Sequence, residues 1–213
     1  MRFYSRKEAG ELMAEMLMSY RGAGDTVVVA LPRGGVPVAY EIATKLELPL
    51  DIFFVKKIPS PYNEEVGIGA VSENGLIRID SRTVEAMNVS QEYIRSRVHE
   101  KLRQMGEKRV LYGRSGSDFG SKTVIVVDDG IATGSSMMLA VEALKKAGAS
   151  KVVVAVPVAP VELIPTLKEM ADDVQVLHPD PNLIAVGRFY DDFHQLEDSE
   201  VIDILHKSSR LRS

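Results

Sequence analysis

The sequence contains no cysteine, no tryptophan and only four histidines. Without cysteine, the chain cannot form disulfides, thiolate nucleophiles or cysteine-based zinc and iron–sulfur sites. The histidines are scattered and provide no pair at the helical spacing of a zinc site. No segment approaches the roughly 18 apolar residues that a membrane span requires. The charged segment 1–20 lacks the apolar core of a signal peptide, so we expect a cytoplasmic protein with no membrane partner.

The charge balance bears on whether the protein binds nucleic acid. The 26 basic and 30 acidic side chains give a formal net charge of −4. A net negative chain argues against a protein that coats nucleic acid by neutralising phosphates. The 213 residues, of which 45% are hydrophobic, suffice for one globular core.

Short apolar runs alternate with helical segments along most of the chain. A parallel sheet with helices on both faces is predicted when fully apolar strands alternate with helices. Segments 68–71 and 76–79 flank an Asn-Gly turn and predict a β-hairpin. We therefore expect an α/β, Rossmann-like core over residues 1–178 and a small C-terminal hood over 179–213. The strands are predicted at 26–31, 51–55, 123–127, 151–158 and 174–177.

The most informative segment is VIVVDDGIATGSSM, which begins at Val124 and ends at Met137. Its strand brings Asp128 and Asp129 to the carboxyl edge of the sheet, where open α/β folds bind ligands. Adjacent carboxylates repel each other, so a diol or a bound cation would relieve the pair. The loop that follows offers hydroxyls, backbone amides and a helix N-terminus, which together bind anions. A diol beside a phosphate describes ribose 5-phosphate.

A second loop, Leu31-Pro32-Arg33-Gly34-Gly35, also joins a strand to a helix. Its two glycines let the backbone approach a ligand closely, and its arginine can hold phosphate oxygens in a bidentate manner. Lys56 and Lys57 are expected to end the next strand at the same edge. The chain has no Walker A loop and no G-x-G-x-x-G, so nucleoside triphosphate hydrolysis and hydride transfer are not indicated.

These motifs resemble those of the type I phosphoribosyltransferases, whose signature is an apolar strand, an acidic pair and a T-G-S/T-S/T loop. The resemblance implies that Asp128 and Asp129 form the catalytic pair and hold the ribose hydroxyls. It implies a 5-phosphate site formed by Ala132, Thr133, Gly134, Ser135 and Ser136. It also implies a pyrophosphate site formed by Arg33, Gly34, Gly35, Lys56 and Lys57. Gly130 departs from the family pattern, which usually has an aliphatic residue there.

The segment 186–193 resembles the hood of the purine-type members of that family. This likeness implies that Phe189 or Tyr190 stacks on a base and that Asp191 or Asp192 approaches Mg²⁺, with Asp192 assigned as the metal residue. Packing of the tail is the alternative explanation of the aromatic residues. Ala132 stands where hypoxanthine–guanine enzymes commonly carry an aspartate.

The family places a mobile loop in the region 60–120. Three basic residues of the predicted helix 91–112 are candidates to compensate pyrophosphate charge: Arg97, Lys101 and Arg109. The alternative is that they form a solvated helix face.

The predicted function is Mg²⁺-dependent transfer of 5-phosphoribose from 5-phosphoribosyl 1-diphosphate (PRPP) to a nitrogenous acceptor, with release of pyrophosphate. A purine-like base is one candidate acceptor, and an acceptor that is not a base is another. The alternative function is a regulator on the same fold that binds PRPP or a nucleotide. A homodimer is the oligomeric state that the resemblance suggests.

Overall fold

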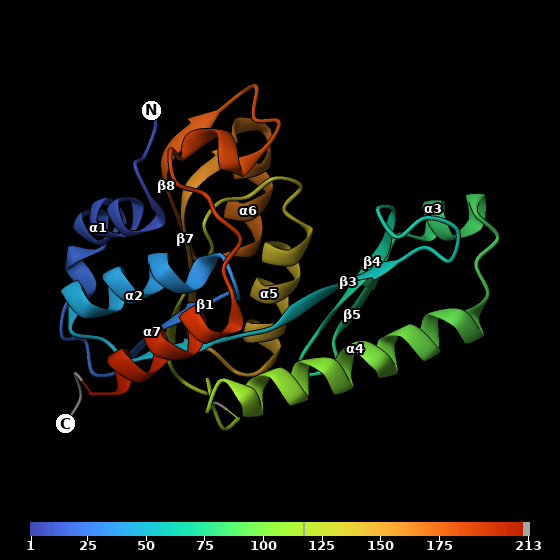
Figure 1. Ribbon diagram of the computed structural model, residues 1–213, viewed down its shortest axis with the longest axis horizontal. Coiled ribbons are helices and arrows are strands. Elements are labelled where there is room, and N and C mark those ends of the chain that lie inside the picture. Colours follow the sequence, from blue (N-terminus) through green and yellow to red (C-terminus); the bar gives the residue numbers. More distant parts are fainter. Residues whose placement is uncertain (117, 211–213) are drawn as a thin grey trace.

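The core of the protein is a five-stranded parallel sheet (Figure 1). The computed structural model describes residues 1–116 and 118–210. The strands have the order β2-β1-β6-β7-β8, and every neighbouring pair is parallel. Their bounds are β1 Thr26–Ala30, β2 Leu50–Ile52, β6 Thr123–Val127, β7 Lys151–Pro160 and β8 Asp173–Asp180. The predicted parallel sheet is confirmed.

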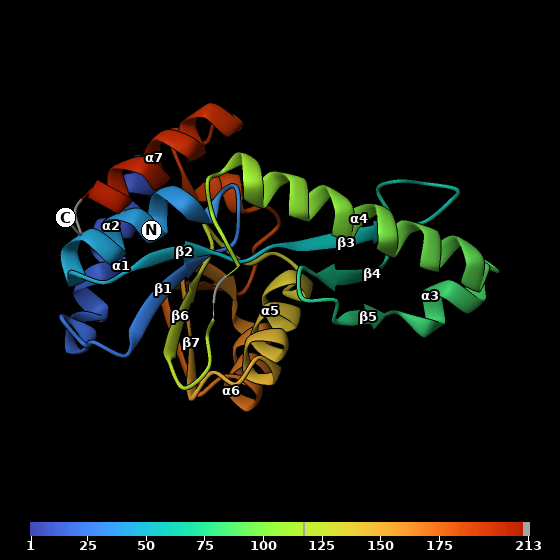
Figure 2. The ribbon, with the colours of Figure 1, turned by 90° about the horizontal axis from the view of Figure 1, so that it is seen from below.

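Helices cover both faces of this sheet (Figures 1 and 2). Val28 and Ile125 face one hydrophobic cluster, which includes residues of α1 (Arg6–Met16), α2 (Gly35–Leu46) and α7 (Asp198–Arg210). Val27 and Val126 face a second cluster, which includes residues of α5 (Ser135–Lys146) and α6 (Ile164–Met170). Because both faces are covered, all five residues of β1 and all five of β6 are buried, which explains why both strands are apolar after their first residue, a threonine. The described residues also form short 3₁₀ helices outside the core: η1 Met18–Tyr20, η2 Val161–Leu163 and η3 Val186–Phe189.

A long arm extends from one side of the core (Figure 2). Its antiparallel sheet contains β3 (Val55–Pro59), β4 (Gly67–Ser72) and β5 (Ile77–Ile79). The arm continues into α3 (Ser81–Ala86) and α4 (Gln91–Leu111). Pairing of β4 with β5 confirms the predicted hairpin.

The strand expected over 51–55 is wrong, because the chain changes sheets within it. β2 ends at Ile52 in the parallel sheet, and β3 begins at Val55 in the arm. Phe53 and Phe54 are both buried, but they belong to the two different hydrophobic clusters. The sequence pattern alone could not separate this crossing from one buried strand. As a result, Lys56 and Lys57 lie within β3 and not at the edge of the core sheet.

The C-terminal segment packs back on the core. Phe3 forms a parallel bridge with Tyr190, and α7 lies against α2. β8 continues to Asp180, past the predicted boundary at 178/179, and the division into core and hood stays a prediction. Within the described residues, no helix is both long and apolar enough to cross a membrane.

Candidate active site at the carboxyl edge of the sheet

Asp128 and Asp129 directly follow β6, so the buried strand fixes their position at the sheet edge. An oxygen of Asp128, Oδ1, accepts the backbone N–H of Asp129 at 2.9 Å. Arg6 of α1 donates from Nε to Asp129 Oδ2 at 2.8 Å, and its side chain is only 9% exposed. Both carboxyl groups line a cavity of about 340 Å³. We call Arg6, Asp128 and Asp129 the acidic-pair cluster.

The electrostatics of this cluster are those of an under-compensated pair. Burial raises the pKa of Asp128 well above its ordinary value, and the neighbouring charge of Asp129 raises it further. Burial also raises the pKa of Asp129, although Arg6 opposes that shift. One buried cation therefore serves two adjacent carboxyl groups, and an additional donor or cation in the cavity would stabilise their ionised forms.

The loop between β1 and α2 lies directly against the acidic pair. A Cβ atom at Gly34 would lie 2.2 Å from Asp129 Oδ2, and one at Gly35 would lie 2.6 Å from the carbonyl oxygen of Val127. A side chain at Gly35 would meet the backbone, and one at Gly34 would displace the carboxyl group of Asp129. The peptide bond between Pro32 and Arg33 is cis. Arg33 lines the acidic-pair cavity, so this loop and the two carboxyl groups meet as the sequence predicts.

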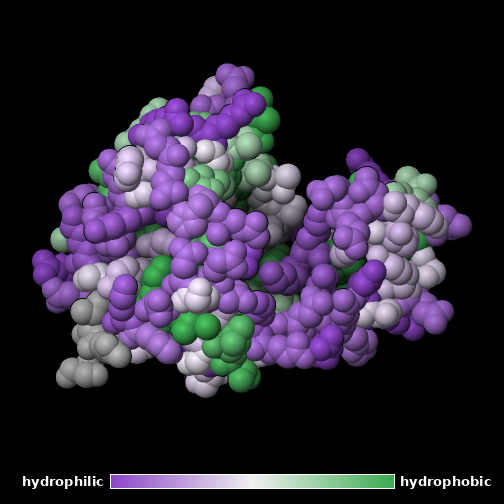
Figure 3. All heavy atoms as spheres, in the orientation of Figure 1, coloured by the Kyte–Doolittle hydropathy of each residue, from purple (hydrophilic) through white to green (hydrophobic). Residues whose placement is uncertain are grey.

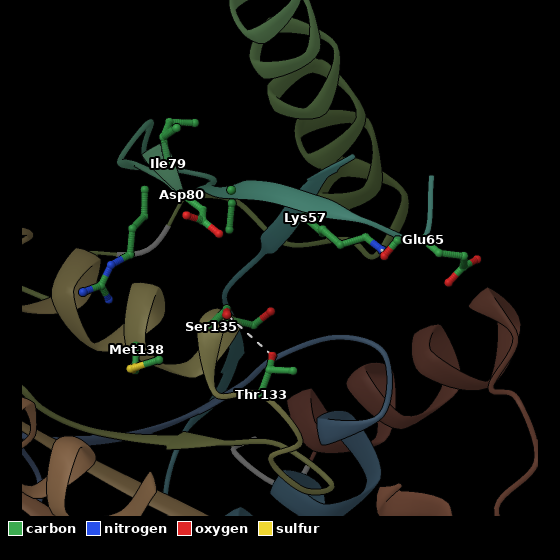
Figure 4. Close-up of a pocket in the computed structure, with 12 residues that line it drawn as sticks. Lys57, Glu65, Ile79, Asp80, Thr133, Ser135 and Met138 are labelled. Carbon is green, nitrogen blue, oxygen red and sulfur yellow. Dashed lines mark hydrogen bonds between the residues drawn. The ribbon is translucent and has the colours of Figure 1, made fainter. Parts of the chain in front are cut away.

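The loop 132–136 leads into the N-terminus of α5. Gly134 precedes the helix with φ +78°, a left-handed conformation that favours glycine. Figure 3 shows the surface hollowed between core and arm. Thr133, Ser135 and Ser136 line a second cavity of about 540 Å³ between α5 and the arm (Figure 4). Ala132 is exposed at the start of the loop. Hydroxyls and helix amides are therefore concentrated at one accessible place, as anion binding requires.

Gly130 stands between the acidic pair and this loop, and the structure explains why it departs from the family pattern. A Cβ atom at this position would lie 2.6 Å from Val186 Cγ1 and 2.7 Å from Val158 Cγ2. The tail that carries Val186 thus packs on β7 at the point where an aliphatic side chain would project.

The two predicted pyrophosphate lysines lie on opposite sides of β3. Lys57 lines the α5 cavity with Thr133, and its Nζ donates to the carbonyl oxygen of Glu65 at 3.0 Å (Figure 4). Lys56 is directed the other way, because successive side chains of a strand alternate. Burial, followed by the positive charges of Arg33, Lys101 and Lys108, lowers its pKa. Lys56 thus lies with Arg33, whereas Lys57 lies with the predicted phosphate loop.

The predicted base-binding aromatics lie outside both cavities. Tyr190 is 2% exposed, and its hydroxyl donates to the carbonyl oxygen of Asp129 at 2.6 Å. Its ring stacks on Phe193 at 5.1 Å, and Phe189 packs against His178. For Tyr190 this arrangement agrees with the alternative explanation given above, in which the aromatic residues pack the tail and do not stack on a base. The aromatic residue that does line the acidic-pair cavity is Phe193, with the guanidinium carbon of Arg6 3.9 Å from its ring centre.

Asp192, the predicted metal residue, is exposed and paired within the tail. Its Oδ1 lies 2.9 Å from His194 Nδ1, and hydrogen bonds from His194 lower the pKa of Asp192. Asp191 instead forms an ion pair with Arg2. Neither residue lines the acidic-pair cavity. In the part of the chain that the structure describes, no group of three or more acidic or histidine side chains is arranged to hold a metal ion.

Arg109, one of the three basic candidates on α4, is part of a buried cluster. Arg109 is buried and donates to Glu73 Oε1 and to the carbonyl oxygen of Ile52, both at 2.6 Å. Its Nη1 also lies 3.5 Å from Asp51 Oδ1. We call Asp51, Glu73 and Arg109 the junction cluster, because it joins the arm to the core. This position excludes Arg109 as a solvent-accessible pyrophosphate ligand.

The other two candidates on α4 remain on the surface of the arm. Arg97 pairs with Glu100 at 2.5 Å and lies against Tyr93, whereas Lys101 is close enough to Lys56 to lower its pKa. Sequence reasoning missed the junction cluster because Glu73 lies in a hairpin turn, and nothing in the local pattern links it to a helix 36 residues away.

The phosphoribosyl transferase domain family matches residues 4–187, and the chain belongs to this family. A crystal structure of a protein from Thermus thermophilus is 36% identical in sequence; the match covers 97% of this chain and 99% of that one, with a TM-score of 0.80. The fold is that of the type I phosphoribosyltransferases.

A curated relative from Mycobacterium tuberculosis strain H37Rv is also similar to this chain. It is 33% identical over 210 residues, and its name provisionally calls it a phosphoribosyl transferase. A protein of strain CDC 1551 matches to the same extent. The match covers 98% of this chain but only 47% of the relative, so the chain spans about half the length of the curated relatives it matches.

Proposed function

We propose that the chain transfers 5-phosphoribose from PRPP to a nitrogenous acceptor and releases pyrophosphate. The observation that carries this proposal is the arrangement of residues 128–136. Within one strand-to-helix connection, a buried acidic pair faces one cavity and a hydroxyl-rich helix N-terminus faces another. We propose that this connection holds the sugar diol at the acidic pair and the phosphate at the helix N-terminus, which is a favourable place for an anion.

Each part of the donor has a matching group in the site. The ribose hydroxyls donate to Asp128 and Asp129, which supplies the hydrogen bonds that an under-compensated pair lacks. The 5-phosphate accepts from the hydroxyls of the loop 132–136 and from the α5 amides. Pyrophosphate accepts from Arg33, whose loop already contacts Asp129 through Gly34.

The site is also compatible with Mg²⁺. This ion prefers oxygen ligands and is usually held by one or two carboxylates together with substrate phosphates. Asp128 and Asp129 provide such a carboxylate pair in one cavity, and they fit this role better than Asp192, whose carboxyl group pairs with His194. When bound, Mg²⁺ would neutralise charge on the leaving pyrophosphate.

The protein groups favour separation of the sugar from its leaving group. Displacement at C1 breaks the bond to pyrophosphate as the acceptor nitrogen attacks, and positive charge develops on the ribose ring. The acidic pair holds negative charge beside that ring, and Arg33 holds the leaving pyrophosphate. Phe193 lines the same cavity, but its ring already packs against Tyr190 and Arg6, so we do not assign it as a surface on which a base stacks. A cytoplasmic location and a homodimer remain predictions.

The experiment measures donor binding and turnover separately. The Asp128→Asn/Asp129→Asn double variant should lose PRPP affinity by about 100-fold or more, because two charge-assisted hydrogen bonds are weakened. Asp203→Asn, at an exposed acid on α7, is the control and should bind as the parent does. Isothermal titration calorimetry with PRPP and Mg²⁺ gives the affinities, and pyrophosphate release with a panel of nitrogenous bases gives the activity.

The outcomes distinguish the two functions. Unchanged PRPP binding in the double variant contradicts the role assigned to the acidic pair. PRPP binding by the parent without turnover on any acceptor favours the regulator over the transferase.

A further inference from the structure

Lys56 and three neighbouring cations come from three separate elements of the chain, and one of the four, Arg33, lines the acidic-pair cavity. Arg33 comes from the loop after β1, Lys56 from β3, and Lys101 and Lys108 from α4. Each of the other three cations contributes to the lowered pKa of Lys56 and so lies within electrostatic reach of it, and Arg33 and Lys108 both pair with Asp198. We call these four residues the cation cluster.

One carboxylate, that of Asp198 at the start of α7, is placed among these cations. Its Oδ1 accepts the hydroxyl of Tyr112 at 2.7 Å and lies 3.7 Å from Arg33 Nη1. Its Oδ2 accepts from Lys108 Nζ. The side chain of Asp198 is 29% exposed, so solvent and ligands can reach it. The hydrogen bonds from Lys108 and Tyr112 lower its pKa and keep it ionised.

The charges of this arrangement do not balance. Asp198 pairs directly with two cations of the cluster, Lys108 and Arg33, and Lys56 lies close to all three. A group with several negative charges would compensate these cations more fully. The geometry that holds Asp198, with two cations and a phenol around one pair of oxygens, would equally hold two oxygens of a phosphate.

The position of the cluster indicates which phosphate this would be. Arg33 belongs to the cation cluster and also lines the acidic-pair cavity, together with Gln195 and Leu196, which shortly precede Asp198. The predicted 5-phosphate loop faces a different cavity, on the α5 side of the arm. The cation cluster therefore meets the acidic-pair cavity through Arg33, whereas the predicted 5-phosphate loop lines another cavity.

We propose that Asp198 is an internal anion in the binding site for the diphosphate group, and that the start of α7 must release Arg33 and Lys108 before that group binds fully. This inference rests on the proposed function, because it assigns a place to the leaving group of PRPP. It adds Lys108 and Tyr112 to the diphosphate site. It also implies that Asp198, at the start of α7, competes with the diphosphate group for the same cations. The free energy needed to displace Asp198 weakens diphosphate binding by the same amount.

The test uses the full chain, inorganic diphosphate as the probe and isothermal titration calorimetry. Asp198→Asn should bind diphosphate about fivefold more tightly, because partly exposed ion pairs each contribute up to roughly 1 kcal/mol. The asparagine oxygen can still accept from Tyr112, which preserves the local fold. Asp203→Asn removes the same charge from the exposed side of the same helix and should change the affinity less than about twofold. Lys108→Gln should weaken diphosphate binding by about fivefold.

A second measurement needs no variant. Addition of diphosphate to the parent protein should increase amide hydrogen exchange in the first turn of α7, because Asp198 is released. Unchanged or slower exchange there overturns the proposal, as does equal or weaker diphosphate binding by Asp198→Asn.

Ribose 5-phosphate is titrated in parallel to separate the two proposals. If it binds the parent and all variants alike while Asp198→Asn gains nothing, only the role of Asp198 is wrong. If ribose 5-phosphate, diphosphate and PRPP all fail to bind the parent, the proposed function is wrong and this inference is lost with it.

Discussion

Two buried arginines, each beside a pair of carboxyl groups, make an instructive comparison. Arg109 in the junction cluster and Arg6 in the acidic-pair cluster have nearly the same exposure, 11% and 9%. Arg109 binds a carboxylate and two backbone carbonyl oxygens, and each carboxyl of its cluster also accepts a backbone N–H. In the acidic-pair cluster, only Asp129 is paired with the arginine, and both carboxyl groups border a cavity.

The difference separates a structural cluster from a ligand site. In the junction cluster, Arg109 and two backbone N–H groups bind the carboxyl groups, so breaking any part leaves a buried charge with fewer partners. Asp51 also borders a cavity, of about 350 Å³, and burial raises the pKa of Asp51 and of Glu73, so the two clusters differ in how many hydrogen bonds their carboxyl groups accept. The acidic-pair cluster keeps acceptor capacity toward a cavity, which costs stability in the free protein and is useful only when a ligand supplies donors. Five predictions test this comparison.

The largest effect is expected for Arg109→Met. This change leaves Asp51 and Glu73 buried without their cation, and we expect a loss of about 3–5 kcal/mol in the free energy of unfolding. Urea denaturation followed by circular dichroism measures it. The control is Arg103→Met on the same helix, where the arginine forms an exposed pair with Glu107 and the expected loss is less than about 1 kcal/mol. Equal losses in the two variants would show that the junction cluster contributes no more to the free energy of unfolding than an exposed ion pair does.

A smaller loss is expected for Arg6→Met, about 1–3 kcal/mol, because the adjacent cavity lets water reach Asp129 after the arginine is removed. The double variant Arg6→Met/Asp129→Asn should recover part of this loss, since the charge that needed Arg6 is then absent. The same denaturation experiment measures both. Losses that simply add would contradict a direct coupling of the two side chains.

How much the sequence could predict differs between the same two regions. The sequence predicted that the carboxyl pair and the Arg33-Gly34-Gly35 loop lie at one edge of the sheet, because both follow buried strands that are apolar after an initial threonine. The parallel sheet was predicted for the same reason. The binding roles of the carboxyl pair and the loop stay predictions. Local patterns there determine both the fold and the site.

The arm and the tail depend on contacts between distant segments. The crossing from β2 to β3 at Phe53 and Phe54 was missed, because both residues are buried on different sides of the chain. Arg6 and Phe193 were missed as site residues, because they meet only when α1 and the tail are folded onto the sheet edge. The spacing of apolar residues within a segment cannot indicate an ion pair between residues 6 and 129, which are far apart in the sequence.

A gain in stability is expected for Asp128→Asn, about 0.5–2 kcal/mol at neutral pH, together with loss of donor binding. Glu73→Gln in the junction cluster should instead lose about 1–2 kcal/mol, because Arg109 then faces an amide nitrogen in place of a carboxylate oxygen. Urea denaturation at neutral pH compares the two variants. If both variants change the free energy of unfolding in the same direction, the proposed distinction between the two clusters is wrong.

The pH dependence of the gain follows from the raised pKa of Asp128. Between the ordinary carboxyl pKa and the raised value, the folded protein retains a proton that the unfolded chain has lost, so this group makes stability fall as pH rises. Asp128→Asn should remove that contribution, and its advantage over the parent should therefore shrink toward zero as the pH is lowered through this interval. Denaturation midpoints at a series of pH values measure the effect, and an advantage that grows toward low pH would contradict it.

The smallest effect concerns the helix that carries Arg109. Gly106 is exposed within α4, and a Cβ atom there would meet no atom within 4 Å. Gly106→Ala should therefore raise the free energy of unfolding by about 0.5–1 kcal/mol, because alanine loses less backbone entropy in a helix. In the Arg109→Met background the gain should be smaller if α4 detaches from the core before the core unfolds, and unchanged if arm and core unfold together. Denaturation curves of the single and double variants thus measure how tightly the junction cluster couples the arm to the sheet that carries the site.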